Sequence, residues 1–408
     1  MLKQKNIDKA SPKCIDGMRS QERRFKYMKR QPKIALVYDR VNSRGGAEEI
    51  LKSFHKLIPE APLYTSVYAK KHLEWIPKTL TVIPSWINAV SFFRSRHQVL
   101  GWIMPIVFGR MRPNSTHGVV SITSEFAKGV RHGSGQEHIS YILTPTRYLW
   151  SHQKFYLAVL RERYGVVGYS VGLFLTEILK KIDLQFSKRP THLVAISRLV
   201  ASRIQQYYGR KVESIIYPPV NTSFFSREKV SKSRSKPSYL LWVGRLVPYK
   251  RLDLVVEASK ILNLSLYVVG VGEQSQWISD QAKHNKQITY LGDVSDIKKR
   301  KLMVDASCFI QPGVEDFGIT AVEAVSMGTP VIIHAKSGAS EVLPESDCGK
   351  YIATETIEEI CKAINNVLQK QKKGGYREKK MHAIACRCDT VIFEQQWKEL
   401  LCKTMNMC

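Results

Sequence analysis

The stretch FIQPGVEDFGITAVEAVSMGTPVIIHA, residues 309–335, predicts a strand, a loop, a helix and a second strand in immediate succession. Its two ends are short apolar runs typical of buried strands, and Gly-Thr-Pro ends the helix because proline cannot continue it. Two glutamates, Glu315 and Glu323, stand near the start of this helix with seven residues between them. Alternation of strands and helices is typical of an α/β fold with a parallel sheet.

The same alternation surrounds this stretch in the second half of the chain. Strand-like runs occur in YLLWVGRL at 239–246, LSLYVVGVGE at 264–273 and ITYLG at 288–292, and a helical pattern lies at 250–262. We therefore predict a doubly wound domain at 238–388.

The first half of the chain predicts a second domain of the same class. KIALVYD at 33–39 is an apolar run, and a glycine-containing loop separates it from the amphipathic segment AEEILKSFHKLI at 47–58. Strand, glycine turn and helix are the usual opening of a doubly wound domain, which we place at 33–219. The stretch at 217–238 is rich in proline, serine and lysine, and we interpret residues 220–237 within it as the linker. Because ligands bind at the carboxyl ends of such sheets, we expect the functional site between the two domains.

The charge of the chain favours an anionic partner. The 408 residues are 44% hydrophobic and carry a formal net charge of +28. Residues 1–32 read as a basic arm, and the first 33 residues hold eleven Lys or Arg against three acids. The chain contains neither a signal-peptide pattern nor an apolar run long enough to span a bilayer, so we expect a cytoplasmic protein, soluble or peripheral at the membrane.

Two cations follow the predicted strand at 239–243. Arg245 and Lys250 lie at the start of the next helix, where cations and free backbone N–H groups can hold a diphosphate. Taken alone this pattern also fits an ordinary solvated basic loop. The Gly-x-Gly at 270–272 lacks the third glycine of the dinucleotide fingerprint, so it does not indicate a nicotinamide enzyme.

The residues around the two glutamates suit a phosphorylated sugar. The first helical turn at Gly318, Ile319 and Thr320 offers unpaired N–H groups and a positive dipole end, which favour phosphate oxygens. Carboxylates accept hydrogen bonds from paired hydroxyl groups. We therefore expect Glu315 to contact sugar hydroxyls and Glu323 to contact the ribose diol of a nucleotide.

Several pieces together resemble the nucleotide-sugar domain of family 4 retaining glycosyltransferases, whose E-x7-E motif corresponds to Glu315 and Glu323. The first half also resembles the bacterial O-antigen mannosyltransferase-like branch, and the resemblance runs from about residue 33 to near the C-terminus. The matching pieces are RGGAEEIL, PEAPLYTSVY, SEFAKGVR, TPTRYLW, ISRLVASRIQQYYGRKVESIIYPPVN, WVGRLVPYKRLD, YLGDVSD, QPGVEDFGITAVEAVSMGTPVI and SGASEVL.

The resemblance implies a GT-B fold with an acceptor-binding first domain, a donor-binding second domain, and a final helix at 389–408 that crosses back. It implies retaining transfer of a sugar, mannose as the first choice, from a GDP- or UDP-linked donor to a glycan or lipid-linked acceptor. The catalytic residues implied are Glu315, Arg245 and Lys250. The donor-binding residues implied are Gly244, Arg245, Lys250, Gly270, Glu315, Phe317, Gly318, Ile319, Thr320 and Glu323. The acceptor-side residues implied are Gly45, Gly46, Arg147 and Tyr148.

Two further features qualify these expectations. No Asp-x-Asp occurs, so we expect no metal and no cofactor, with cations and helix amides neutralising the leaving group. Where the branch usually has a histidine before Thr-Pro and an aspartate after the tryptophan of TPTRYLW, this chain has Leu143 and Ser151. Acceptor recognition is therefore expected to differ from that of the branch.

Some alternatives remain open at the level of sequence. A basic nucleic-acid-binding protein would explain the charge but not the spaced glutamates, so we expect no specific nucleic-acid partner. A non-hydrolysing nucleotide-sugar epimerase of the same fold would need acid and base groups that the sequence does not identify. The basic, aromatic stretch at 86–112 fits either an anionic membrane surface or an interior helix pair.

Overall fold

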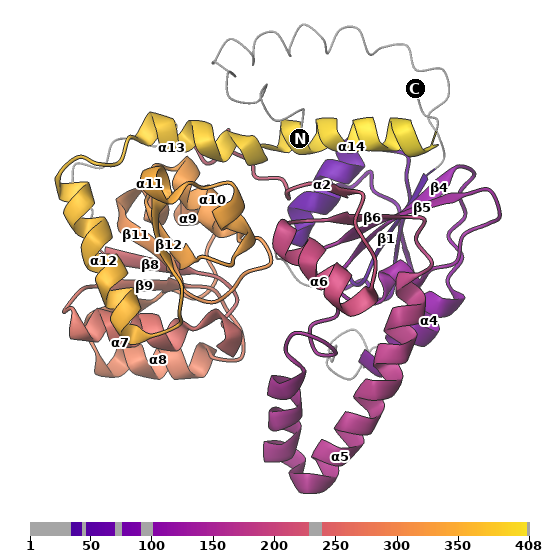
Figure 1. Ribbon diagram of the computed structural model, residues 1–408, viewed down its shortest axis with the longest axis horizontal. Coiled ribbons are helices and arrows are strands. Elements are labelled where there is room, and N and C mark those ends of the chain that lie inside the picture. Colours follow the sequence, from indigo (N-terminus) through magenta and orange to yellow (C-terminus); the bar gives the residue numbers. More distant parts are fainter. Residues whose placement is uncertain (1–33, 43–45, 70–75, 91–100, 228–238, 406–408) are drawn as a thin grey trace, which may run out of the picture.

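A computed structural model describes residues 34–42, 46–69, 76–90, 101–227 and 239–405. The chain forms two α/β domains, each built on a parallel sheet with helices packed against it, and a long helix at the C-terminus returns to the first domain (Figure 1). The predicted fold class of two doubly wound domains is therefore confirmed. Gly45 and the basic arm at 1–32 lie outside the described residues.

The N-terminal domain holds a seven-stranded sheet in the order β3-β2-β1-β4-β5-β6-β7, and every neighbouring pair is parallel. Its strands are β1 (Ile34–Tyr38), β2 (Leu63–Thr65), β3 (Val82–Pro84), β4 (Gly118–Thr123), β5 (Glu137–Ile142), β6 (His192–Ala195) and β7 (Ser214–Ile215). Its α-helices are α2 (Ala47–Leu57), α4 (Met104–Arg110), α5 (Gln153–Ser187) and α6 (Arg198–Tyr208).

The central strands of this sheet are buried along their whole length. Every residue of β4 is buried, as expected for a parallel strand covered on both faces. On one face α2 contributes Ile50, Leu51 and Phe54, an apolar stripe at helical spacing.

The C-terminal domain holds a six-stranded parallel sheet in the order β10-β9-β8-β11-β12-β13. Its strands are β8 (Tyr239–Val243), β9 (Leu266–Val269), β10 (Ile288–Tyr290), β11 (Ala306–Gln311), β12 (Val331–His334) and β13 (Gly349–Ile352). Its α-helices are α7 (Leu252–Ile261), α8 (Ser275–His284), α9 (Asp296–Asp305), α10 (Ile319–Ser326), α11 (Glu345–Cys348), α12 (Ile357–Lys372) and α13 (Glu378–Ala385).

The strand order reverses direction at one place in each sheet. In the N-terminal sheet the reversal lies between β1 and β4, and in the C-terminal sheet it lies between β8 and β11. Loops diverge at such a switch point and leave room for a ligand at the carboxyl ends of the strands. Arg245 follows β8 and Glu315 follows β11, so both come from the switch point of the C-terminal sheet.

Two chain segments connect the domains side by side. Val220 forms a parallel bridge with Asp389, and its backbone N–H donates to the carbonyl of Cys388. After this crossing, α14 (Thr390–Met405) packs on α2 of the N-terminal domain. The ring of Trp397 is fully buried there, against Phe54 and Tyr141.

The aromatic, basic stretch at 86–112 divides between interior and surface. Trp86–Ala89 form a 3-10 turn, residues 91–100 lie outside the described part, and α4 follows. α4 buries Met104, Val107 and Phe108, whereas Trp86 is exposed. The structure thus gives α4 an interior face and leaves Trp86 on the surface.

Candidate active site

Lys250 and Glu315 form an ion pair at the switch point of the C-terminal sheet. The Nζ of Lys250 lies 2.8 Å from Oε1 of Glu315, and both side chains are largely buried. Lys250 ends a 3-10 turn, Pro248–Lys250, that folds over the end of β8. The carboxylate holds the ammonium at the carboxyl edge of the sheet, where ligands bind in folds of this class.

Glycines let this turn lie close to its neighbours. A Cβ at Gly313 would stand 2.4 Å from the carbonyl oxygen of Tyr249, so a side chain there would displace the turn. A Cβ at Gly270, whose φ is +129°, would stand 1.8 Å from the carbonyl oxygen of Gly244. Gly270 therefore permits close packing of its backbone against that of Gly244 at the ends of β8 and β9.

The N-terminus of α10 faces the same edge of the sheet. Gly318 precedes the helix with a φ of +103°, a left-handed conformation that favours glycine. Ile319 and Thr320 form the first turn, whose N–H groups have no acceptor within the helix. The ring of Phe317 is buried and stacks on Tyr217 at a centroid distance of 5.6 Å, so a donor contact from Phe317 would come from its main chain.

Glu323 is buried and paired with a lysine that the sequence did not single out. The Nζ of Lys299 on α9 lies 3.0 Å from Oε1 and 2.9 Å from Oε2 of Glu323. Burial raises the pKa of Glu323, and the charge of Lys299 partly opposes that rise. Lys299 stands in the run Lys298–Lys301, where the sequence gives no reason to prefer one cation over the next.

The N-terminal domain brings its glycine loop to the start of α10. A Cβ at Gly46 would lie 3.0 Å from Cδ1 of Ile319, so the Ile319 side chain comes close to the Gly46 backbone across the domain boundary. Burial raises the pKa of Tyr38 at the end of β1, and the charge of Arg245 is among the groups that lower it. Residues at the carboxyl ends of both sheets therefore interact electrostatically.

Arg147 links the two domains. Its Nε donates to Oδ2 of Asp316 at 3.1 Å, and its Nη1 donates to the hydroxyl of Tyr249 at 2.5 Å. Arg203 of α6 pairs with the other oxygen of Asp316. Burial alone would raise the pKa of Asp316, but Arg147 and Arg203 lower it below its ordinary value. Sequence reasoning missed Asp316, although it follows Glu315 directly.

A second set of contacts joins α6 to the C-terminal domain. The Oγ of Ser197 donates to the carbonyl of Asp316 at 2.6 Å. Glu341 accepts hydrogen bonds from the backbone N–H groups of Arg198 and Leu199, at 2.9 and 3.2 Å. A carboxylate at the positive end of a helix is favourable, so Glu341 stabilises the contact between the domains.

The remaining residues of the expected acceptor side lie in or near the N-terminal core. The hydroxyl of Tyr148 is buried and has no hydrogen-bond partner among the described residues, and its ring contacts that of Tyr156. Leu143 packs against the main core. The Oγ of Ser151 lies 2.8 Å from Nδ1 of His152. The ring of His152 contacts that of Tyr249, with 5.0 Å between the ring centroids. His152 therefore stands beside the domain boundary.

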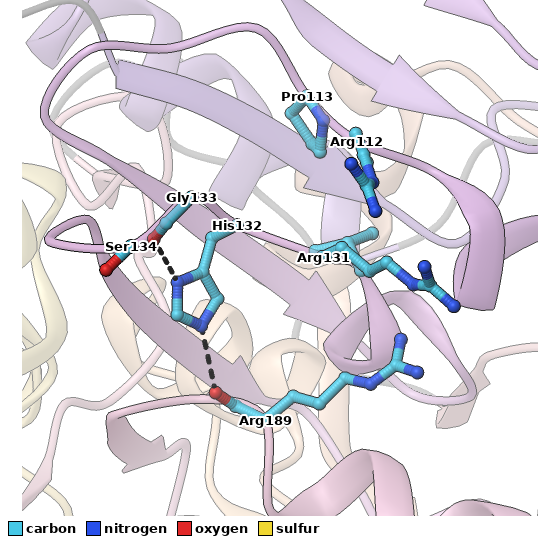
Figure 2. Close-up of a pocket in the computed structure, with 8 residues that line it drawn as sticks. Arg112, Pro113, Arg131, His132, Gly133, Ser134 and Arg189 are labelled. Atoms are coloured by element: carbon cyan, nitrogen blue, oxygen red, sulfur yellow. Dashed lines mark hydrogen bonds between the residues drawn. The ribbon is translucent and has the colours of Figure 1, made fainter.

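A basic cavity lies at the other end of the N-terminal sheet. Figure 2 shows the side chains of Arg112, Arg131 and Arg189 beside the ring of His132. The ring nitrogens of His132 lie near the carbonyls of Gly133 and Arg189, at 3.3 and 3.2 Å. Because these segments precede β4, β5 and β6, the cavity is remote from the carboxyl-end residues described above.

The described part of the chain has neither a metal-ligand cluster nor a membrane-spanning helix. No cluster of three or more His, Cys, Asp or Glu side chains in that part could hold a metal ion. None of its helices is long and apolar enough to cross a membrane.

Comparison with known sequences matches residues 224–383 to the family described as glycosyl transferases group 1. The O-antigen chain mannosyltransferase RfbU of Salmonella typhimurium is 27% identical over 216 residues, which are 48% of this chain and 60% of that protein. An uncharacterized glycosyltransferase of Methanocaldococcus jannaschii is 27% identical over 212 residues, 47% of this chain and 53% of the relative. The chain thus spans between half and two thirds of the length of these relatives.

Solved structures of similar fold cover nearly the whole chain. The Anabaena protein HepE in complex with UDP-glucose gives a TM-score of 0.64 at 18% identity, over 91% of this chain and 100% of that one. Sucrose-phosphate synthase from Thermosynechococcus elongatus gives a TM-score of 0.70 at 12% identity, and the match covers 93% of this chain and 100% of that one. The expected GT-B fold and the resemblance to family 4 glycosyltransferases are both confirmed.

Proposed function

From the match of residues 224–383 to glycosyl transferases group 1 and from the GT-B fold, we propose that this protein transfers a sugar from a nucleoside-diphosphate sugar to an acceptor hydroxyl. The observation that carries the proposal is the group formed by Lys250, Glu315 and the N-terminus of α10, which faces Gly46 of the other domain. It combines a cation, free N–H groups and a carboxylate, which suit a diphosphate joined to a sugar.

Each residue then has a distinct task in the reaction. Arg245, Lys250 and the first N–H groups of α10 neutralise the charge that grows on the leaving diphosphate. Glu323 accepts from the ribose hydroxyls, and Lys299 holds that carboxylate in place. Glu315 accepts from hydroxyls of the transferred sugar. The acceptor hydroxyl attacks from the face that the diphosphate leaves, so the anomeric configuration is retained.

The relatives support particular donors and acceptors. RfbU is an O-antigen chain mannosyltransferase, and several other relatives are phosphatidyl-myo-inositol mannosyltransferases, which supports mannose and a glycan or lipid-linked acceptor. The complex of HepE with UDP-glucose supports a UDP-linked donor. We propose mannose as the sugar and keep GDP and UDP as the two candidates for the nucleotide.

A donor screen tests this proposal. GDP-mannose, UDP-glucose and UDP-galactose are incubated with the full chain, and release of GDP or UDP is measured with and without lipid-linked and soluble glycans. We expect turnover of one donor, and an α-linked product from an α-linked donor by NMR. Turnover of none of the donors would contradict the transferase, and inversion would contradict the retaining course.

We also propose that the reaction needs no metal, since cations and helix amides serve the diphosphate. EDTA should leave the rate of nucleotide release nearly unchanged. Loss of activity that Mn²⁺ or Mg²⁺ restores would show that a metal takes part in the reaction.

The two alternative functions have no support from the comparisons. A non-hydrolysing epimerase would give an epimerised nucleotide sugar instead of a transferred sugar, so product analysis in the same screen separates the two. A nucleic-acid-binding protein would hold DNA in a salt-dependent filter assay and release no nucleotide from any donor.

A further inference from the structure

Helix α5 is a hairpin that projects from the N-terminal domain (Figure 1). Gly165 has a φ of 67° and a ψ of −160° and separates a short arm, 153–164, from a long arm, 166–187. Two glycines of the long arm bring the arms together, since a Cβ at Gly172 would stand 2.5 Å from Cδ1 of Leu160 and one at Gly168 would stand 2.4 Å from Cβ of Tyr164. The base of the long arm is anchored in the domain by the buried residues Asp183 and Phe186.

The long arm carries an apolar stripe with no partner among the described residues. Val167, Val171, Phe174 and Ile178 are 75%, 51%, 66% and 42% exposed. Their spacing of four, three and four residues places them on one face of the helix. Residues 172, 176 and 179, on the other side of the helix, are buried, so the stripe is not part of the core.

The tip of the hairpin continues this apolar surface around the end of the element. Tyr164 and Val166 flank the turn and are 59% and 68% exposed. Val159 of the short arm is exposed as well. Apolar side chains therefore continue from the stripe to the turn, where they meet the exposed charged residues 161–163 of the short arm.

Charged residues lie at both ends of the apolar stripe, and because Gly168 packs on Tyr164 and Gly172 on Leu160, residues 161–163 lie beside the long arm close to the turn. No Asp, Glu, Lys or Arg occurs between Arg163 and Glu177. The cations Arg161, Arg163, Lys180 and Lys181 flank the gap, against the acids Glu162 and Glu177. The guanidinium of Arg163 lies 5.5 Å from the ring centre of Tyr164, an arrangement suited to the interface between lipid headgroups and acyl chains.

We propose that the α5 hairpin docks this protein on an anionic bilayer, with the apolar stripe of the long arm lying among the lipids and the exposed cations Arg161, Arg163 and Lys181 at the headgroups. An interfacial helix buries its apolar face about 5–10 Å deep, so the stripe enters one leaflet. These cations favour phosphate-bearing lipids, since each Lys or Arg near such a surface adds attraction.

This docking brings the candidate active site to the membrane. The hairpin begins directly after His152, whose ring meets that of Tyr249, and the Tyr249 hydroxyl accepts from Arg147 and Arg245. A lipid-linked acceptor lying in the same leaflet would then reach the domain boundary beside the donor residues. Only this last step rests on the proposed function; the docking itself does not.

Vesicle cosedimentation of the full chain tests the proposal. The wild type is compared with Val167→Asp/Phe174→Asp, using phosphatidylcholine vesicles with and without phosphatidylglycerol, at low salt and at 0.5 M salt. High salt weakens the charged contacts, including those of the basic arm, while apolar insertion persists. We expect the double substitution to lower binding to anionic vesicles at least tenfold.

A matched control is Ile261→Asp/Val391→Asp, which changes two exposed apolar residues on α7 and α14. This control should bind vesicles like the wild type, and circular dichroism should show that all three proteins are folded. Release of nucleotide from the donor in solution should be equal in all three, which separates a failure of docking from a failure of the proposed reaction.

Three results would overturn the proposal. The first is equal pelleting of the wild type and the hairpin variant, and the second is no pelleting of the wild type with either vesicle. The third is a dimer in sedimentation velocity that the hairpin variant dissolves, because the stripe would then cover a second copy of the chain.

Discussion

Glu323 combines burial with a bound cation, so a substitution there tests the proposed ribose contact. We predict that Glu323→Gln lowers the affinity for UDP or GDP by about 1–3 kcal/mol, roughly 5- to 150-fold, because the ribose hydroxyls lose a charged acceptor. Titration calorimetry measures this. The matched control is Glu257→Gln, which breaks an exposed Glu–Lys pair on α7 and should leave the affinity unchanged.

A second variant separates the ribose contact from the pairing with Lys299. If Glu323 only neutralises Lys299, then Glu323→Gln/Lys299→Met should regain the wild-type affinity. If Glu323 contacts the ribose, the affinity should stay low. Recovery in the double variant would reject the ribose contact.

His138 on β5 makes the stability of the protein depend on pH. It is fully buried, its Nε2 lies 2.8 Å from Oγ of Ser121, and burial lowers its pKa to about 3 from an ordinary 6.5. Below pH 6.5 the unfolded chain binds a proton that the folded chain rejects. The contribution of neutral His138 to the free energy of unfolding is therefore complete above about pH 6.5 and is lost as the pH falls toward 3.

The predicted size of this effect between pH 7 and pH 5 is about 2 kcal/mol, at about 1.4 kcal/mol for each unit below 6.5. Urea unfolding at both pH values should show that His138→Gln is less sensitive to the change than the wild type. The exposed His284→Gln serves as the control and should behave like the wild type. An equal loss of stability in the wild type and His138→Gln would show that His138 does not cause it.

At the scale of elements, the loop before α10 serves both domains at once. Glu315 pairs with Lys250 within the C-terminal domain, while the next residue, Asp316, pairs with Arg147 and Arg203 of the N-terminal domain. The same loop that carries a predicted donor ligand therefore also fixes the distance between the domains.

We predict a measurable coupling between Arg147 and Asp316. In a double-mutant cycle of Arg147→Met and Asp316→Asn, urea unfolding should give a coupling energy of about 0.5–3 kcal/mol, since the pair is buried and directly hydrogen-bonded. The exposed pair Lys260 and Glu257 provides the comparison and should couple by less than about 1 kcal/mol. A coupling near zero for Arg147 and Asp316 would mean that the pair does not hold the domains together.

At the scale of the whole molecule, α14 makes the stability of the N-terminal domain depend on the far end of the chain. Trp397 is fully buried against Phe54 of α2 and Tyr141 of β5. Lys56 of α2 pairs with Glu394 of α14 at 2.8 Å. The helix therefore completes the core of the N-terminal domain, although along the chain the entire C-terminal sheet lies between them.

We predict that Trp397→Ala destabilises the protein by about 3–5 kcal/mol, since it leaves a large cavity in a closely packed core. The exposed Trp86→Ala should change the stability by less than about 0.5 kcal/mol. Thermal and urea unfolding measure both variants. A small effect of Trp397→Ala would show that α14 contributes little to that core.

The sequence by itself determined the local order of this protein. Apolar runs separated by helical patterns are set by neighbouring residues, so 309–335 was enough to predict a strand–helix–strand unit, and the structure has β11, α10 and β12 there. The motif at Glu315 and Glu323 was also visible, because both residues belong to one short segment. The same local spacing indicated that Arg245 and Lys250 follow a strand.

Only the tertiary structure decided which distant residues meet. Lys299 reaches Glu323 from another helix, and Arg147 reaches Asp316 from another domain. Neither Lys299 nor Asp316 stands out locally. Lys299 is one of four cations in a row, and Asp316 directly follows Glu315 of the E-x7-E motif. The tertiary structure also decided that the apolar stripe of α5 is exposed. An apolar helix face looks alike in sequence whether it is buried or exposed, and only the tertiary packing showed that this one has no partner among the residues that the structure describes.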